Sequence, residues 1–185
     1  MAKVIGYHAC ERTFAEKLKT NELTIAQWAP SQNDYDWLGH GIYFWEANSR
    51  RAKEWAAEHI KGEAAIIEAE IDLGLCFDLP SSEYVVLLSI VYASAVVVYQ
   101  QRGKPLPTNE AGGGKLRRLD CLIINEFLRM MDNGRGLPPI RFQTVRCPFE
   151  EGEPIFPGSM IRRQTHIQIA VRDYNCIRIT DFDVR

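Results

Sequence analysis

The longest apolar stretch of the chain, residues 84–99, sets the first limit on what the chain folds into. It is interrupted by Ser89 and Ser94 and is shorter than the roughly 20 apolar residues that a helix needs to cross a bilayer. Its valines also suit a strand, but its length favours a helix. We therefore predict a buried helix of a globular protein and no membrane partner.

The composition fits a single globular domain over residues 1–185. With 46% hydrophobic residues, the chain is able to bury a core without disulfides or structural metals. The formal net charge is −2, so no overall basic field indicates a nucleic-acid partner, although a local basic patch remains compatible with one.

The cysteines indicate free thiols in a reducing compartment. Their odd number argues against a disulfide framework, and none forms the Cys-x-x-Cys pair of a zinc site. They are Cys10, Cys76, Cys121, Cys147 and Cys176. Residues 1–8 also lack the apolar segment of a secretory signal, so we expect a cytoplasmic protein without a metal.

Segments with strand and helix patterns alternate along the chain. We expect strands over residues 3–9, 39–46, 64–71, 140–145, 165–172 and 176–181. We expect helices over residues 11–19, 48–61, 81–101 and 119–131. We expect residues 80–140 to be an insertion within the domain.

Two of the strands carry residues that suit chemistry. Tyr7-His8-Ala9 stands where a strand turns sharply into a helix, and Gly39-His40-Gly41 opens an aromatic strand that contains Tyr43. Each residue alone has an ordinary interpretation, because a strand histidine is most often structural and a tyrosine between aromatic residues most often fills a core.

The order of these motifs resembles the catalytic domain of the poly(ADP-ribose) polymerases and diphtheria toxin. That family has a Tyr/Trp-His-Gly strand, a Gly-x-Gly-Ile-Tyr-Phe strand and a Glu-Val-Ala-Leu-Gly strand, matched here by residues 7–9, 39–44 and 68–74. The resemblance implies an α+β fold in which two small, mainly antiparallel sheets flank an NAD cleft, with peripheral helices. A doubly wound parallel sheet is the rival, but it would need a Gly-rich phosphate loop after the first strand.

By the resemblance, NAD is a substrate and the catalytic residues are His8, Tyr43 and Gln168. The family usually has Glu at the position of Gln168, and its wider superfamily accepts Glu, Asp or Gln there. The residues implied to bind NAD are Tyr7, His8, Ala9, Gly41, Tyr43 and Trp55. Ala9 replaces the family's glycine, and the family's serine and second tyrosine correspond to Ala52 and Trp55.

These residue types suit cleavage of the nicotinamide glycosidic bond. His8 is able to hydrogen-bond the ribose, the Ala9 backbone to pair with the carboxamide, and Tyr43 to offer a flat ring face. Gln168 cannot accept a proton as a base, so we expect single ADP-ribose units rather than polymers. His166, two residues away, is either the missing base or a structural histidine.

We therefore expect a mono-ADP-ribosyltransferase that modifies a protein or nucleic acid, as in bacterial toxins and phage-defence effectors. The alternatives are an NAD glycohydrolase of the same fold and an inert NAD- or ADP-ribose-binding module. An RNA 2′-phosphotransferase of this fold uses several arginines, so Tyr43 argues against it. Residues 147–163 occupy the place where such transferases choose their acceptor.

Overall fold

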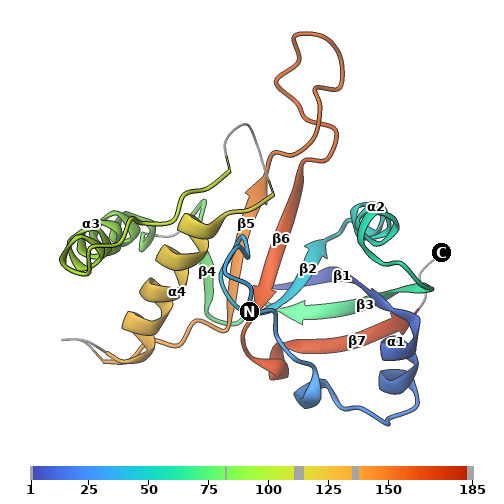
Figure 1. The fold of residues 1–185 in the computed structure, drawn as a ribbon. Helices are drawn as coiled ribbons and strands as arrows, with labels where there is room; N and C mark the ends of the chain where they lie inside the picture. Colours follow the sequence, from blue (N-terminus) through green and yellow to red (C-terminus); the bar gives the residue numbers. More distant parts are fainter. Residues whose placement is uncertain (1, 82, 111–114, 135–137, 183–185) are drawn as a thin grey trace.

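The computed structural model describes residues 2–81, 83–110, 115–134 and 138–182 (Figure 1). The strands are β1 (Lys3–Glu11), β2 (Ile42–Glu46), β3 (Ala64–Asp72), β4 (Cys76–Asp78), β5 (Thr144–Phe149), β6 (His166–Val171) and β7 (Ile177–Phe182). The α-helices are α1 (Arg12–Lys19), α2 (Ser49–His59), α3 (Val85–Gln101) and α4 (Arg118–Asp132). Residues 111–114 and 135–137 of the expected insertion lie outside the described residues.

The strands form one mixed sheet in the order β4-β5-β6-β2-β1-β3-β7. β4 and β5 run parallel, and the other five pairings are antiparallel. The expected α+β class is confirmed, and the doubly wound parallel sheet is wrong. The two separate sheets that the resemblance implies are not found within the residues that the structure describes. Gly6 pairs with Glu46 and Tyr7 pairs with Trp45, so β1 is joined to β2 and all seven strands form one sheet.

The helices divide between the two faces of this sheet (Figure 1). On one face, Ala15 and Leu18 of α1 pack with Phe44 and Ile67 in a continuous apolar cluster. On the other face, α4 covers the strands from β4 to β6, and α2 covers β1 and β2. The Tyr43 ring belongs to the cluster under α4, whereas the Trp45 ring belongs to the cluster under α2. β2 therefore lies beneath the boundary between α2 and α4.

Helix α3 corrects one expectation from the sequence. The helical prediction is confirmed, but the predicted burial is wrong, because Val91 is the one buried residue among the 17 of α3. The neighbouring helix α4 has a periodic apolar face, which includes Phe127 and Leu128. This face packs on the sheet and covers the surface on which α3 would otherwise be buried. Helix α3 packs against the outside of α4 instead (Figure 1).

The segment between β5 and β6 extends away from the sheet as a narrow arm, residues 150–165 (Figure 1). Backbone bonds such as Ile155 N to Ile161 O hold its two sides together. Phe156 and Met160 near its tip are 59% and 82% exposed. β5 begins at Thr144 and runs four residues beyond the expected end of that strand, so the base of the arm is regular structure. Over the described residues, no helix is both long and apolar enough to span a bilayer.

Candidate active site

Strand β1 separates from β2 immediately after Tyr7. Backbone groups of alternate residues point to opposite edges of a strand, and the bond from Ala47 N to Ile5 O shows that odd-numbered residues of β1 face β2. At the opposite edge of β1, Arg12 N donates to Glu63 O, which directly precedes β3, so even-numbered residues of β1 face β3. Ala9 therefore directs its N–H and C=O toward β2, but the pairing between these strands ends at Tyr7 with Trp45.

The His8 side chain stands at this point of separation. Its Nδ1 lies 2.8 Å from the backbone oxygen of Tyr43. Because a carbonyl oxygen accepts only, Nδ1 carries the hydrogen, and Nε2 of the neutral ring is an acceptor. Nε2 has no hydrogen-bond partner among the described residues.

Aromatic neighbours keep the His8 ring neutral. Trp28 meets it edge-on with ring centroids 4.7 Å apart, and the Phe44 ring centroid lies at 5.7 Å. Burial lowers the pKa of His8 to about 4, although the hydrogen bond to Tyr43 raises it. The imidazole is therefore uncharged at neutral pH and has one fixed tautomer.

Tyr43 anchors the loop that precedes its own strand. Its hydroxyl donates to Gly39 O at 2.6 Å and accepts from Leu38 N at 2.8 Å. Burial raises the pKa of Tyr43 well above 10, and the negative charge of Asp36 adds to this effect. The hydroxyl is thus committed to the protein, and the ring packs against the apolar cluster under α4.

Gly41 has a packing role that the resemblance did not imply. Its N–H and C=O are both hydrogen-bonded to Ser31. A side chain at Gly41 would meet Val171 O at 3.0 Å and Ala170 Cβ at 3.1 Å, so the missing side chain permits close approach to β6. The predicted contact between Gly41 and NAD receives no support from this geometry, because its backbone groups are already paired.

Gln168 lies in the middle of the sheet with its side chain free. It pairs with Trp45 of β2 on one side and Cys147 of β5 on the other. Its amide makes no hydrogen bond to any part of the chain that the structure describes. Tyr43 lies two residues from Trp45 and so shares the face of Gln168, whereas the His8 ring lies with Phe44 toward the opposite face.

Tyr7 and Trp55 lie on the same side of the sheet as Trp45. Burial raises the pKa of the Tyr7 hydroxyl, and the Glu68 carboxylate beside it raises it further. The Trp55 ring lies 5.9 Å from that of Trp45, and His59 stacks on it at 4.6 Å. His59 thus covers one face of the predicted stacking residue.

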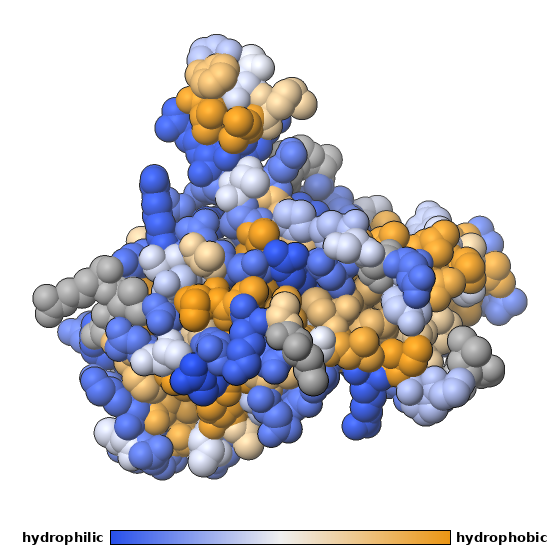
Figure 2. Space-filling view, turned by 180° about the vertical axis from the view of Figure 1, so that it is seen from behind, coloured by the Kyte–Doolittle hydropathy of each residue, from blue (hydrophilic) through white to orange (hydrophobic). Residues whose placement is uncertain are grey.

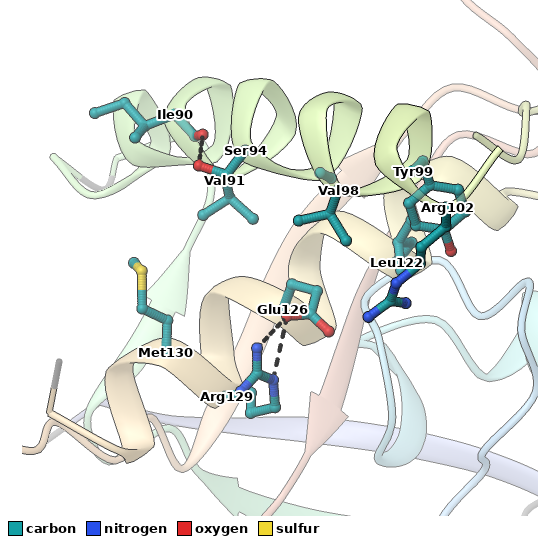
Figure 3. Close-up of a pocket in the computed structure, with 11 residues that line it drawn as sticks. Ile90, Val91, Ser94, Val98, Tyr99, Arg102, Leu122, Glu126, Arg129 and Met130 are labelled. Atoms are coloured by element: carbon teal, nitrogen blue, oxygen red, sulfur yellow. Dashed lines mark hydrogen bonds and ion pairs between the residues drawn. The ribbon is translucent and has the colours of Figure 1, made fainter. Parts of the chain in front are cut away.

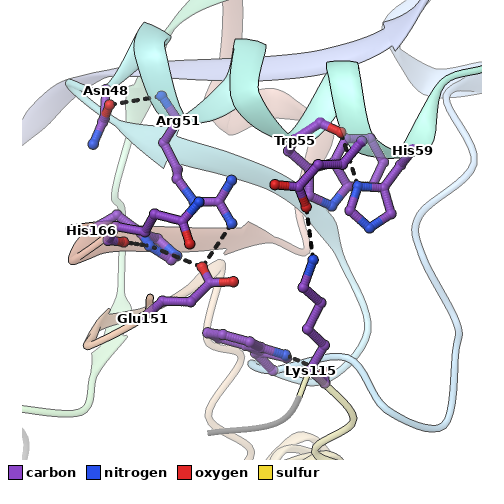
Figure 4. A network of polar contacts seen from close by, with 10 residues as sticks. Asn48, Arg51, Trp55, His59, Lys115, Glu151 and His166 are labelled. Atoms are coloured by element: carbon purple, nitrogen blue, oxygen red, sulfur yellow. Dashed lines mark hydrogen bonds and ion pairs between the residues drawn. The ribbon is translucent and has the colours of Figure 1, made fainter. Parts of the chain in front are cut away.

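A buried polar network joins α2 to the arm and to His166 (Figure 4), which is two residues before Gln168 on β6. Arg51 of α2, 4% exposed, donates to Glu151 at 2.7 Å, and His166 Nδ1 donates to Gln164 O at 2.6 Å. His166 Nε2 and two Arg51 nitrogens, Nε and Nη1, are buried and have no partner within the described ranges. Burial lowers the pKa of His166. His166 is therefore enclosed, and it can serve as a base only after this network opens.

A second set of contacts joins α2 to the segment that precedes α4 (Figure 4). Lys115 forms a 2.8 Å ion pair with Glu58 of α2, and its carbonyl accepts from Trp37 Nε1 at 2.7 Å. The Arg117 guanidinium lies over the Trp37 ring at 4.2 Å, a cation–π contact. These contacts link α2 to the segment before α4 across the sheet face on which Gln168 lies.

None of the five cysteines forms a disulfide bond, and burial raises the pKa of Cys121 and of Cys176 to about 11. No group of three or more His, Cys, Asp or Glu residues suited to a metal ion occurs in the described part of the chain.

Comparison with known proteins gives one relative of this chain and no function. No protein-family model matches the sequence. An uncharacterized protein of Methanocaldococcus jannaschii, MJ0359, is 34% identical over 153 residues, which cover 77% of this chain. The matched region spans 63% of that protein, so the relative is considerably longer than the region it shares.

The structure brings only some of the predicted residues together. His8 contacts the Tyr43 backbone oxygen beside Ala9 where β1 leaves β2, but the Tyr43 ring and Gln168 lie on the sheet face opposite the His8 ring. Arg51 and Glu151 were not predicted as residues of the site. Their separation of 100 residues conceals the pair, although Arg51 stands four residues before Trp55 and so shares its helix face.

Proposed function

We propose that this chain is an NAD-dependent mono-ADP-ribosyltransferase that binds the nicotinamide half of NAD where β1 separates from β2. The observation that carries the proposal is the pair of polar groups of β1 at this point that are unbonded within the described chain, the backbone of Ala9 and Nε2 of His8. The unbonded amide of Gln168 is on β6, across β2 and on the sheet face opposite the His8 ring. Each of the three is a residue that the motif order implies.

Each free group matches one part of the substrate. The Ala9 N–H and C=O are a donor and an acceptor side by side, the pattern complementary to a carboxamide. His8 Nε2 is an acceptor on a neutral ring with a fixed tautomer, which suits a ribose hydroxyl. Positioning of this kind lowers the barrier to cleavage of the glycosidic bond because the reacting atoms are held in place.

Gln168 supports transfer of single units. Its amide is able to orient the ribose, but it has no basic site with which to activate a hydroxyl of a growing polymer. His166 is the nearest histidine on the same strand, and its Nε2 is buried. We infer that the acceptor supplies its own nucleophile, activated by a group that it brings or that the opened network exposes.

The sheet is compatible with the two-sheet arrangement of the ADP-ribosyltransferase fold. One half holds β4, β5, β6 and β2, and the other holds β1, β3 and β7. The two residue pairs that connect β1 to β2 contrast with nine between β1 and β3. We infer that the halves correspond to the two sheets of that fold, with the NAD cleft at their junction.

The acceptor is a protein or a nucleic acid that contacts the arm. Arg162 and Arg163 lie on the arm close to β6, and a nucleic acid would place phosphates against them. Phe156 and Met160 at the tip are exposed apolar residues, which favour a protein acceptor. Five cysteines without a disulfide bond fit a cytoplasmic site of action.

Incubation with NAD labelled in the adenylate tests the proposal. Label on a macromolecule supports transfer, free labelled ADP-ribose shows a glycohydrolase, and intact NAD that binds measurably shows an inert module. Mass spectrometry of protein, RNA and DNA from the same reaction then identifies the acceptor. NAD that neither binds nor reacts would overturn the proposal.

A further inference from the structure

Helix α3 exposes an apolar surface that nothing in the described chain covers. Residues 85–101 contain no charged side chain, and 11 of the 17 residues are exposed. Figure 2 shows a broad hydrophobic surface at the end of the molecule that α3 forms. A helix that is apolar around its whole circumference is normally buried, so this surface requires a partner.

The most exposed apolar residues of α3 follow a coiled-coil spacing. Val86, Ile90, Ala93 and Val97 are separated by four, three and four residues, so they form one straight stripe. Val86 is 63% exposed, Ile90 59% and Val97 51%. At 3.6 residues per turn, the stripe lies on the side of α3 that points away from α4.

A groove runs alongside this stripe, between α3 and α4 (Figure 3). Its volume is about 390 Å³. Ile90 and Val98 of α3 and Leu122 and Met130 of α4 give it apolar walls, whereas Glu126 on α4 is neutralised by Arg129. The groove therefore has space for side chains that reach past the stripe from a second helix.

We propose that α3 is the contact surface between two copies of this chain, packed antiparallel about a two-fold axis midway between Ile90 and Ala93. The four stripe residues are symmetric about this point, so Val86 of one copy meets Val97 of the second copy and Ile90 meets Ala93, and each contact occurs twice. Beside the axis the small Ala93 side chains let the two helices approach closely. This inference is independent of the proposed activity.

The charge and the contact area of the α3 surface both indicate which partner binds it. A neutral strip that meets an identical strip creates no like-charge repulsion, and the cores of interfaces are depleted in charge. A helix that lies on a membrane has a basic polar face, which α3 lacks. A 17-residue helix is about 25 Å long. Its contact is smaller than the roughly 800 Å² per partner of a standard interface, so we expect a weak dimer.

Sedimentation velocity of the full chain from about 1 to about 300 μM tests this inference. The wild type should show a dimer fraction that rises with concentration, and Ile90→Lys with Val97→Lys should remain monomeric throughout. Both substitutions are at exposed positions, so circular dichroism should show unchanged folding. The matched control, Met160→Lys with Ile161→Lys on the arm, changes equally exposed residues and should dimerise like the wild type.

Cysteine cross-linking tests the orientation separately. Under mild oxidation, Ala93→Cys should give a covalent dimer well above the wild-type background, because the two-fold axis brings this position close to itself. Gln101→Cys should not, because the two copies of this position lie at opposite ends of the paired helices. A wild type that is monomeric at all concentrations, loss of dimer in the arm variant, equal cross-linking of both variants, or flotation with neutral lipid vesicles would each overturn the inference.

Discussion

His8 Nδ1 donates to the backbone oxygen of Tyr43 at 2.8 Å, one residue beyond the last pair between β1 and β2. The Tyr43 oxygen is the next acceptor that a continuous pair of strands would use, and the imidazole bonds it. Ala9, the next residue that faces β2, is outside the pairing. One side chain thus marks the end of the pairing and presents a free acceptor, Nε2, at the same place.

Substitution of His8 separates these two roles. His8→Ala should reduce NAD cleavage about 10²-fold or more, because loss of an anchor misplaces the reacting atoms. In His8→Asn the side-chain amide is able to keep the bond to Tyr43 O but supplies no acceptor in place of Nε2, so cleavage should fall to a similar extent while stability changes little. The measurement is nicotinamide release, paired with a thermal denaturation curve.

The matched control for these variants is His40→Ala, since His40 is an exposed histidine. It should retain wild-type cleavage. If His8→Asn also cleaved NAD at the wild-type rate, His8 would be a structural residue that holds two strands.

The lowered pKa of His8 predicts a dependence of stability on pH. Its pKa is about 4 in the folded chain, against an ordinary value of 6.5, so on acidification the unfolded chain takes up the proton first. The His8 contribution is therefore complete above about pH 6.5. It is lost as the pH falls toward 4, by up to about 1.4 kcal/mol per pH unit.

Denaturation midpoints of the wild type and His8→Asn between pH 4 and 7 measure this effect. Carboxylates titrate in both proteins, so the difference between the two curves isolates His8. The wild type should lose more stability than the variant as the pH falls. Parallel curves would show that His8 keeps its ordinary pKa.

Two substitutions of Tyr43 test the roles of its ring and its hydroxyl separately. Tyr43→Ala should abolish NAD cleavage because the ring face is lost. Tyr43→Phe should keep much of the cleavage but lose about 1–3 kcal/mol of stability, since Leu38 N and Gly39 O lose their buried partner. Steady-state kinetics and urea denaturation check both outcomes, and a Tyr43→Ala variant of wild-type activity would assign the ring to the core alone.

Gln168 should control the fate of ADP-ribose. Gln168→Ala should cripple transfer, whereas Gln168→Glu should retain or raise NAD cleavage, because a carboxylate also stabilises positive charge that develops at the ribose. Gln164→Ala is the control, a glutamine four residues earlier on the arm that should have little effect. Gel analysis of the products should show single units for the wild type, and long polymers would contradict the role given to Gln168.

Much of the fold was predictable because local patterns and tertiary packing agree. The strand-like segments around His8, Tyr43 and Gln168 became β1, β2 and β6, and the periodic apolar face around Phe127 became α4. β4 was missed because its three residues are too few to show a period. The predicted strand over residues 140–145 was displaced because β5 is defined by its pairing with β4 and β6.

The remaining differences depend on partners distant in the sequence. Hydropathy alone cannot tell whether the residues of α3 are covered, and here α4 occupies the sheet in its place. The sequence does not show that Gly41 serves packing against Ala170 rather than ligand contact. The same is true of the pair between Arg51 and Glu151, which α2 and the arm bring together only in the folded chain.

A crystal structure of the chain with NAD or a non-cleavable analogue tests the proposed NAD site most directly. The nicotinamide carboxamide should lie within hydrogen-bond distance of the Ala9 N–H and C=O, with a ribose hydroxyl against His8 Nε2. NAD bound elsewhere, for example in the groove between α3 and α4, or a nicotinamide that contacts neither Ala9 nor His8, would contradict it.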